Sequence, residues 1–166
     1  RYFIELCYNG SAYHGWQMQT NTDSVQEVLQ TGLKYKMAVT EKVTGCGRTD
    51  TGVHARQFYA HFNYPVLLSS EKLNESVNLM NGYLPKDISI FRLFRVKNDA
   101  HARFDAISRT YKYYINQVKN PFNENFAWTQ RFDFNVVEMN KAASVLKEYT
   151  DFTSFAKIHT DVKTNN

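Results

Sequence analysis

The first part of the chain shows apolar residues at a period of two, which is typical of a β-strand with one buried face. Over residues 2–8 every second side chain is apolar or aromatic, and the same alternation returns over residues 58–64, where Pro65 ends it. Residues 41–47 and 88–96 are predicted to form two further strands. The alternating positions are Tyr2, Ile4, Leu6, Tyr8, Phe58, Ala60, Phe62 and Tyr64.

Two segments between these strands have the spacing of an amphipathic helix. The first opens with Ser24 and Glu27 at the spacing of a capping box, in which side chains satisfy backbone N–H groups of the first turn. The second begins near Ser70, and we expect the Asn81-Gly82 pair to cap its C-terminus. The apolar stripes are Val25, Val28, Leu29 and Leu33 in the first helix and Leu73, Val77 and Met80 in the second.

The predicted order up to residue 97 is strand, helix, strand, strand, helix, strand. This is the ferredoxin-like pattern of the α+β class, an antiparallel sheet with its helices on one face. We expect residues 1–97 to form an N-terminal α/β domain and residues 98–166 to form a second, related α/β domain that is incomplete. Its predicted elements are a long strand over residues 107–118 and a helix capped by Asn135. The residues of that helix expected to face inward are Met139, Ala142, Ala143 and Leu146, and a polar tail follows from residue 160.

The composition fits a globular protein, and the charge is unevenly distributed. Hydrophobic residues make up 43% of the 166 positions and charged residues 22%, which allows a buried core. The net charge is +4, but residues 92–119 alone hold seven basic and two acidic residues, and the rest of the chain has a balance of −1. Such a basic stretch fits a groove for an anionic partner such as a nucleic acid; a solvated strand face is the alternative.

The cysteines and the N-terminal residues indicate which cellular compartment to expect for the protein. Cys7 and Cys46 lie in strand-like segments without a Cys-x-x-Cys pair, so a reduced, cytoplasmic protein is the better interpretation and a disulfide stays open. The chain opens on a strand and shows no basic-then-apolar leader. No run approaches the roughly 18 apolar residues of a membrane span, and we expect no membrane association.

One ten-residue segment concentrates the candidate chemistry. Residues 47–56 read Gly-Arg-Thr-Asp-Thr-Gly-Val-His-Ala-Arg, one acid among basic residues and between two glycines. Because predicted strands flank the segment, Asp50 is expected on a tight loop at a sheet edge. A carboxylate is ionised at neutral pH and needs no activating base, and Arg48 and Arg56 favour that form. Asp50 is therefore a candidate nucleophile, and the alternative is an Asx turn in which it bonds its own loop.

That segment resembles the active-site loop of the TruA-type tRNA pseudouridine synthases. Further segments resemble the same family in the same order, over nearly the whole chain. They are Tyr-Asn-Gly-Ser-Ala-Tyr-His-Gly-Trp-Gln-Met-Gln at residues 8–19, Ser-Val-Gln-Glu at 24–27, His-Ala-Arg-Phe at 101–104, Arg-Thr-Tyr-Lys-Tyr at 109–113 and Asp-Phe-Thr-Ser-Phe at 151–155. The segments at 101–113 resemble the central strand of the family, and the last resembles a later strand.

The resemblance implies two similar α/β halves, a homodimer, and the isomerisation of uridine to pseudouridine in the anticodon stem-loop of tRNA, at tRNA positions 38 to 40. The bond between N1 of uracil and C1′ of ribose breaks and C5 joins C1′, so no cofactor or metal is required. The catalytic carboxylate matches Asp50; whether it attacks the sugar, adds to the base or removes a sugar proton stays open. Thr110 stands where an arginine is common, and the later arginine that pairs with the catalytic acid has no counterpart here.

The remaining site residues follow from the same resemblance. A base in a stem must be flipped out and held by stacking, and Tyr111 matches the aromatic side chain that packs on it; a core position is the alternative. Arg48 matches the arginine beside the catalytic acid, and we expect it to contact phosphate and to occupy or stabilise the flipped state; a purely structural pairing with Asp50 is the alternative. His54 is interpreted as a hydrogen bonder that shapes the loop, with a proton carrier as the alternative, and Trp16 either lies near RNA or packs. The candidates for phosphate contact are Arg103, Arg109 and Lys112.

Three other functions compete with this interpretation. The main alternative is a non-catalytic RNA-binding module on a ferredoxin-like sheet, although the strands lack the sequence pattern of RNA-recognition motifs. A glycoside hydrolase would need a second acid near Asp50, and Asp105 is the candidate on the basic stretch. A metal site built from Cys46, His54 and His61 has no standard zinc spacing.

Overall fold

The computed structural model describes residues 1–155 and forms two compact units, Arg1–Tyr111 and Lys112–Asn166. The boundary between the units falls later than the expected one after residue 97. Within the described part of the chain, no helix has the length and apolar character needed to cross a membrane.

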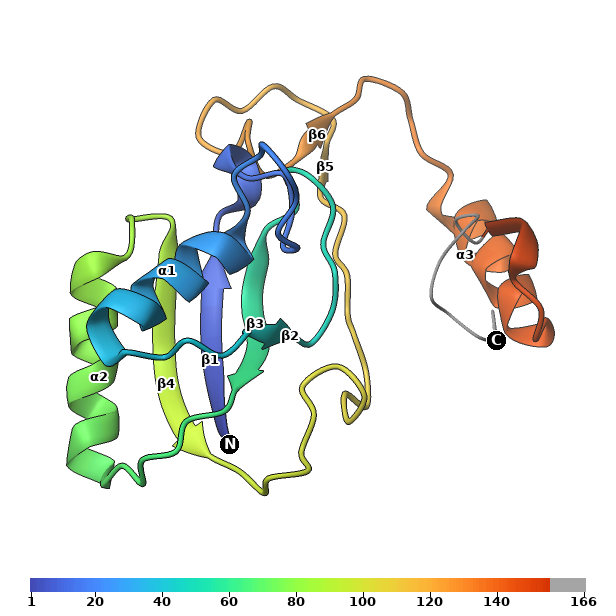
Figure 1. Ribbon diagram of the computed structural model, residues 1–166. Helices are drawn as coiled ribbons and strands as arrows, with labels where there is room; N and C mark the ends of the chain where they lie inside the picture. The colour runs from blue at the N-terminus through green and yellow to red at the C-terminus, as the bar shows by residue number, and fades with distance from the viewer. Residues whose placement is uncertain (156–166) are drawn as a thin grey trace. The chain divides into compact units, whose positions relative to one another are not determined.

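The first unit contains a four-stranded antiparallel sheet in the order β2-β3-β1-β4 (Figure 1). Its strands are β1 (Tyr2–Tyr8), β2 (Thr44–Gly45), β3 (Ala55–Phe62) and β4 (Ile88–Arg95), within the four predicted segments or close to them. β1 lies between β3 and β4, and β2 is an edge strand beside β3. The order of the elements and the antiparallel pairing confirm the predicted α+β class and its ferredoxin-like arrangement.

Two helices connect the strands, α1 (Val25–Met37) and α2 (Ser70–Tyr83), and Figure 1 shows both on the same side of the sheet. Each helix begins at a serine N-cap. The hydroxyl oxygens of Ser24 and Ser69 accept the backbone N–H of the third residue that follows, both at 3.3 Å. The capping box predicted for the first helix is therefore confirmed on its serine side.

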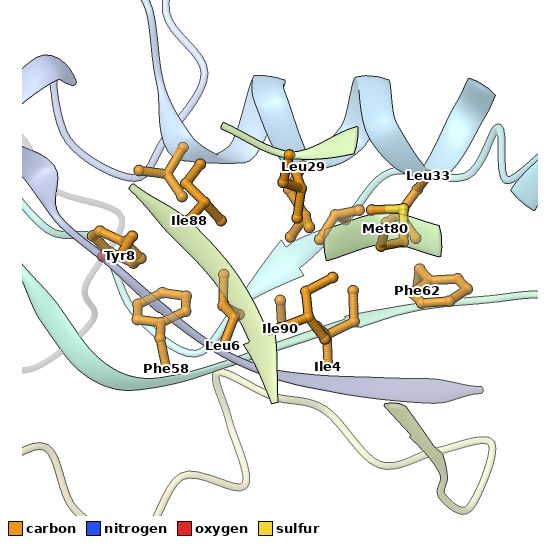
Figure 2. Close-up of a cluster of buried hydrophobic side chains, with 14 of the residues drawn as sticks. Ile4, Leu6, Tyr8, Leu29, Leu33, Phe58, Phe62, Met80, Ile88 and Ile90 are labelled. Atoms are coloured by element: carbon orange, nitrogen blue, oxygen red, sulfur yellow. The ribbon is translucent and has the colours of Figure 1, made fainter. Parts of the chain in front are cut away.

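The core fills the space between these helices and one face of the sheet (Figure 2). The alternating residues of the predicted strands supply the sheet side, with the side chains of Ile4 and Leu6 completely buried. Gly32 allows α1 and α2 to approach, because a Cβ at this position would lie 3.0 Å from Cε of Met80. The residues labelled in Figure 2 include Tyr8, Leu29, Leu33, Phe58, Phe62, Ile88 and Ile90.

The C-cap predicted for α2 is wrong. The helix continues to Tyr83 and its C-cap is Leu84, so the Asn81-Gly82 pair lies inside the last turn. The Asn81 amide bonds β4 instead: Nδ2 donates to the carbonyl oxygen of Ile90 at 2.8 Å, and Oδ1 accepts the N–H of Ile90 at 2.7 Å. A tertiary contact therefore uses the side chain that local turn chemistry had assigned to the helix end.

Residues 98–111 belong to the first unit because they are bonded to it. Nη1 of Arg1 donates to the carbonyl oxygen of Ala100 at 2.8 Å. The N–H of Ala102 donates to Nδ1 of His61 at 3.1 Å, and both of these residues are buried. This segment therefore continues the first unit beyond β4.

The strand predicted over residues 107–118 is wrong for most of its length. Within it, the structure has only β5 (Ile115–Asn116), which pairs in parallel with β6 (Trp128–Thr129) in the second unit. A strand needs a neighbour to pair its backbone N–H and C=O groups. Among the described residues of the second unit, β6 supplies such a neighbour for two residues only.

The helix predicted in the second unit is present as α3 (Val136–Val145), and it begins as predicted at Asn135, whose Oδ1 accepts the N–H of Glu138 at 3.2 Å. Two 3-10 turns follow, η2 (Leu146–Glu148) and η3 (Thr153–Phe155). The second turn occupies the segment that resembles a later strand of the family.

The inward packing expected for α3 is wrong for the described residues, since no residue of this helix is buried. Met139 and Leu146 are about half exposed, at 52% and 48%. The physical reason is that the sheet of this unit consists of two strands of two residues each, which offers no apolar face to a helix. The polar tail predicted from residue 160 lies outside the described residues.

Candidate active site

Asp50 lies on the loop that leaves the edge strand β2 and enters β3, as the sequence predicts. Its side chain is exposed to solvent, and the neighbouring Thr49 is half-buried. Positively charged side chains stand on both sides in the sequence, Arg48 before it and Arg56 after it, and both are exposed. The Asp50 carboxylate is therefore exposed at a sheet edge, in a segment that carries positive charge.

The Asx-turn alternative for Asp50 does not fit the backbone of this loop. Such a turn uses the N–H two residues after the aspartate, which is that of Gly52. That N–H donates to the carbonyl oxygen of Tyr13 at 3.2 Å. The next N–H, from Val53, donates to the backbone carbonyl of Asp50, also at 3.2 Å. The loop is closed by main-chain bonds, so it does not require the Asp50 carboxylate.

The segment that follows β1 is hydrogen-bonded to the Asp50 loop. The N–H of Trp16 donates to the carbonyl oxygen of Thr49 at 3.1 Å. The N–H of Gly10, in the 3-10 turn η1 (Gly10–Ala12), donates to Nδ1 of His54 at 3.1 Å. This bond supports the interpretation of His54 as a residue that shapes the loop.

Two glycines allow the segment after β1 to approach the Asp50 loop closely. A Cβ at Gly10 would lie 2.1 Å from the carbonyl oxygen of Val53, and a Cβ at Gly15 would lie 2.2 Å from that of Thr49. Gly15 also has a φ of +88°, in the left-handed region that favours glycine. The backbone on either side of Asp50 is therefore packed directly against the backbone of the opening segment.

Tyr8 links the loop to the core. Its hydroxyl group shares a hydrogen bond of 2.9 Å with Oγ1 of Thr49, the residue before Asp50. Burial raises the pKa of Tyr8 to about 12, the hydrogen bond to Thr49 lowers it, and smaller electrostatic effects of Cys46 and Tyr111 raise it further. Tyr8 thus remains a neutral hydrogen-bonding group at any physiological pH.

An aromatic cluster supports the same region. The Trp16 ring lies 4.3 Å from that of Phe58, between ring centroids, and Tyr8 lies 5.6 Å from Phe58. Trp16 is only 2% exposed, and a Cβ at Gly45 would lie 2.5 Å from its ring. Of the two roles considered for Trp16, this burial supports packing, and contact with RNA stays a prediction.

The candidates in the basic stretch differ in their surroundings. Tyr111 is 67% exposed, so the core position considered for it is wrong and a ring face is available for stacking. Nε and Nη2 of Arg109 donate to the carbonyl oxygen of Cys46 at 2.9 and 2.7 Å. The Arg103 guanidinium lies over the Phe104 ring, 5.7 Å from its centroid. Lys112 is exposed and belongs to the second unit.

Residues considered for other functions have structural partners. Nδ1 of His61 accepts the N–H of Ala102, and burial together with Arg1 and His101 lowers the pKa of His61 to about 4. Within residues 1–155, no three His, Cys, Asp or Glu side chains gather as metal ligands would. Oδ2 of Asp105 accepts the backbone N–H of His101 at 2.7 Å.

The residues that hold the loop were not predicted from the sequence. Tyr8 and Thr49 are 41 positions apart, and Tyr13 and Gly15 contact the loop through their backbone. Alternation placed Tyr8 on the buried face of its strand, which was the one signal that pointed to it. No local pattern indicates which loop a buried hydroxyl group reaches.

Proteins that share one name resemble the chain over nearly its whole length. No protein-family model matches the chain. A tRNA pseudouridine synthase A of Bacteroides fragilis is 51% identical over 166 residues, which cover 99% of this chain and 65% of the relative. Proteins of the same name from Bacteroides thetaiotaomicron and Listeria monocytogenes are 49% and 35% identical, over 99% and 97% of this chain and 60% and 65% of their own lengths. The chain thus spans less than two thirds of the length of these relatives. At this similarity over nearly all of its residues, the chain belongs to the TruA-type tRNA pseudouridine synthase family.

Proposed function

We propose that this protein isomerises uridine to pseudouridine in tRNA and that Asp50 is the catalytic carboxylate. The observation that carries the proposal is an exposed carboxylate on a loop that main-chain hydrogen bonds hold without using it. A fixed backbone around a free reactive group is the arrangement expected of a catalytic residue, because positioning supplies much of the rate enhancement. The relatives named tRNA pseudouridine synthase A support the choice of reaction.

The reaction needs little from the protein beyond position and charge. The bond from N1 of uracil to C1′ of ribose breaks, the base turns, and a bond from C5 to C1′ forms. C5 then loses a proton and N1 gains one, so the product is an isomer of the substrate. A carboxylate that is ionised at neutral pH acts on the sugar or the base of the target uridine without an activating base.

The surroundings of Asp50 suit an RNA substrate. The target uridine must leave its helix to reach the loop, which costs a few kcal/mol. The exposed ring of Tyr111 offers a stacking surface, worth about 1–3 kcal/mol per base. Arg48 and Arg56 supply positive charge near the ribose phosphates. By its resemblance to the family, we infer that the target lies in the anticodon stem-loop and that the active protein is a homodimer.

The test measures pseudouridine formation in tRNA that lacks pseudouridine. It compares the unchanged full-length protein with two variants, Asp50→Ala and Asp50→Asn. We expect pseudouridine at specific positions of the anticodon stem-loop with the unchanged protein and none with either variant. Asp50→Asn is the matched variant, because it keeps the size of the side chain and removes the carboxylate. Mapping by chemical labelling and primer extension identifies the positions.

Binding measurements separate this proposal from a non-catalytic RNA-binding module. For the enzyme, we expect Asp50→Asn to bind the same tRNA with nearly unchanged affinity while forming no product. Equal product from unchanged protein and Asp50→Asn would contradict the catalytic role of Asp50. Specific tRNA binding without product, from the unchanged protein, would support the binding module.

A further inference from the structure

Arg109 holds the peptide from which the Asp50 loop starts. Its Nε and Nη2 donate to the carbonyl oxygen of Cys46, at 2.9 and 2.7 Å. The N–H of the same residue, Cys46, donates to the carbonyl oxygen of Tyr59 in β3 at 2.7 Å. The Cys46 main chain is therefore fixed through its N–H by the sheet and through its carbonyl by Arg109.

The same guanidinium group also binds the segment that leads to Tyr111. Nη2 of Arg109 donates to the carbonyl oxygen of Arg103 at 2.6 Å. Close by, the N–H of Ala102 is bonded to the buried ring of His61. Arg109 thus joins the start of the Asp50 loop to the 101–109 segment, two residues before Tyr111.

We propose that Arg109 is a positioning residue for the catalytic reaction, which sets the loop of Asp50 relative to Tyr111, and that it is not a phosphate ligand. This inference rests on the proposed function, since both groups that it positions are the ones proposed to handle the target uridine. The planar guanidinium presents several N–H donors in a fixed fork, and here one edge of it is occupied by main-chain oxygens. A phosphate ligand would keep that edge for the RNA.

The contact with Gly47 fits the same role. A Cβ at Gly47 would lie 3.4 Å from Nε and 3.6 Å from Cδ of Arg109, so the side chain runs directly over the loop backbone. A lysine at position 109 keeps the charge but has one compact ammonium group in place of the fork. It is therefore expected to lose the simultaneous bonds to Cys46 and Arg103.

The experiment uses Arg109→Lys and Arg109→Gln in the full protein, with the exposed Lys86→Gln on the turn before β4 as a control for charge. We expect both Arg109 variants to lower the single-turnover rate constant at saturating tRNA by about 10- to 100-fold. The dissociation constant for tRNA and its dependence on salt should stay as in the unchanged protein. Lys86→Gln should leave rate and affinity unchanged, and melting curves confirm that each variant is folded.

A phosphate ligand would give the opposite pattern and overturn the proposal. Arg109→Gln would then weaken tRNA binding and reduce its salt slope by about one unit, with the rate at saturation unchanged and Arg109→Lys close to the unchanged protein. Unchanged rate and affinity in both variants would overturn it as well.

A readout without catalysis keeps this test distinct from that of the proposed function. Trypsin cleavage after Arg48 and amide hydrogen exchange of residues 46–50 should both become faster in Arg109→Lys than in Lys86→Gln. If the unchanged protein forms no pseudouridine, the proposed function fails, and these rates alone decide whether Arg109 holds the loop. Equal cleavage and exchange in the two variants would contradict that role.

Discussion

The hydroxyl group of Tyr8 and Oγ1 of Thr49 lie 2.9 Å apart, and this single bond connects the buried end of β1 to the residue before Asp50. Tyr8 is 3% exposed, so its hydroxyl group has few alternative partners. A buried hydroxyl group that loses its partner stays out of water without a compensating hydrogen bond, and this destabilises the folded state. The loop conformation and the core are therefore coupled at this position.

We expect Tyr8→Phe to keep the fold but to lower the free energy of unfolding by about 0.5–1.5 kcal/mol, because one buried hydrogen bond is lost. Pseudouridine formation should fall more than tRNA binding, since the residue before Asp50 loses its anchor. Urea denaturation followed by circular dichroism measures the first effect. Thr49→Ser, which retains the hydroxyl group, is the control. Its free energy of unfolding should lie closer to that of the unchanged protein than the value for Thr49→Val, which lacks the hydroxyl group. A larger loss of stability in Thr49→Ser than in Thr49→Val would refute the coupling.

Gly15→Ala should destabilise the first unit strongly. The new Cβ meets the carbonyl oxygen of Thr49 at 2.2 Å, and φ at this position is +88°, so both backbone segments must shift. Overpacking of this kind typically costs about 1–3 kcal/mol, to which the left-handed conformation adds about 1–2 kcal/mol. The matched control is Gly82→Ala inside α2, where a Cβ would meet no atom within 4 Å apart from its chain neighbours and the backbone of its own helix; it should stabilise the helix by about 0.5–1 kcal/mol. Thermal melting distinguishes the two, and similar melting temperatures would speak against the close contact.

Asn81→Ala should lower the free energy of unfolding by about 1–3 kcal/mol, because it leaves both the N–H and the carbonyl oxygen of Ile90 without the bonds that Asn81 makes. Asn78→Ala, at an exposed position of the same helix, is the control and should change stability by less than about 0.5 kcal/mol. Urea denaturation of both variants checks the difference. A negligible loss in Asn81→Ala would mean that the tie between α2 and β4 adds nothing to stability.

The stability of the first unit should fall as the pH is lowered below about 6.5. In the folded protein, burial lowers the pKa of His61 from 6.5 to about 4, so between these values the unfolded chain binds a proton that the folded chain does not. The contribution of His61 is complete above pH 6.5 and is lost towards pH 4, by at most about 3 kcal/mol at 1.36 kcal/mol for each pH unit.

Urea denaturation at pH 7, 6 and 5 tests this dependence, since the pKa of the Glu5 carboxyl is lowered and that group titrates below this range. His61→Gln retains an acceptor for the N–H of Ala102 and removes the titrating ring. In this variant the slope of stability against pH should decrease; an unchanged slope would assign the dependence to other groups.

The sequence by itself determined the elements whose signals are local. Alternation predicted β1 and β3, because a strand with one buried face needs apolar residues at a period of two. Serine and asparagine caps marked the starts of α1 and α3, because the first N–H groups of a helix need acceptors. Flanking strands and two glycines also placed Asp50 on a loop at the sheet edge.

Only the tertiary structure decided which partners the remaining groups take. Asn81 reaches β4 instead of ending α2, Trp16 packs on Phe58, and Arg109 binds the carbonyl oxygen of Cys46. The residues at 107–114 form no strand, because strand formation depends on a neighbour that is distant in the sequence. Hydrogen-bond donors and aromatic rings can be read from a sequence, but their partners depend on how the whole chain folds, and that is why the supports of Asp50 appear only in three dimensions.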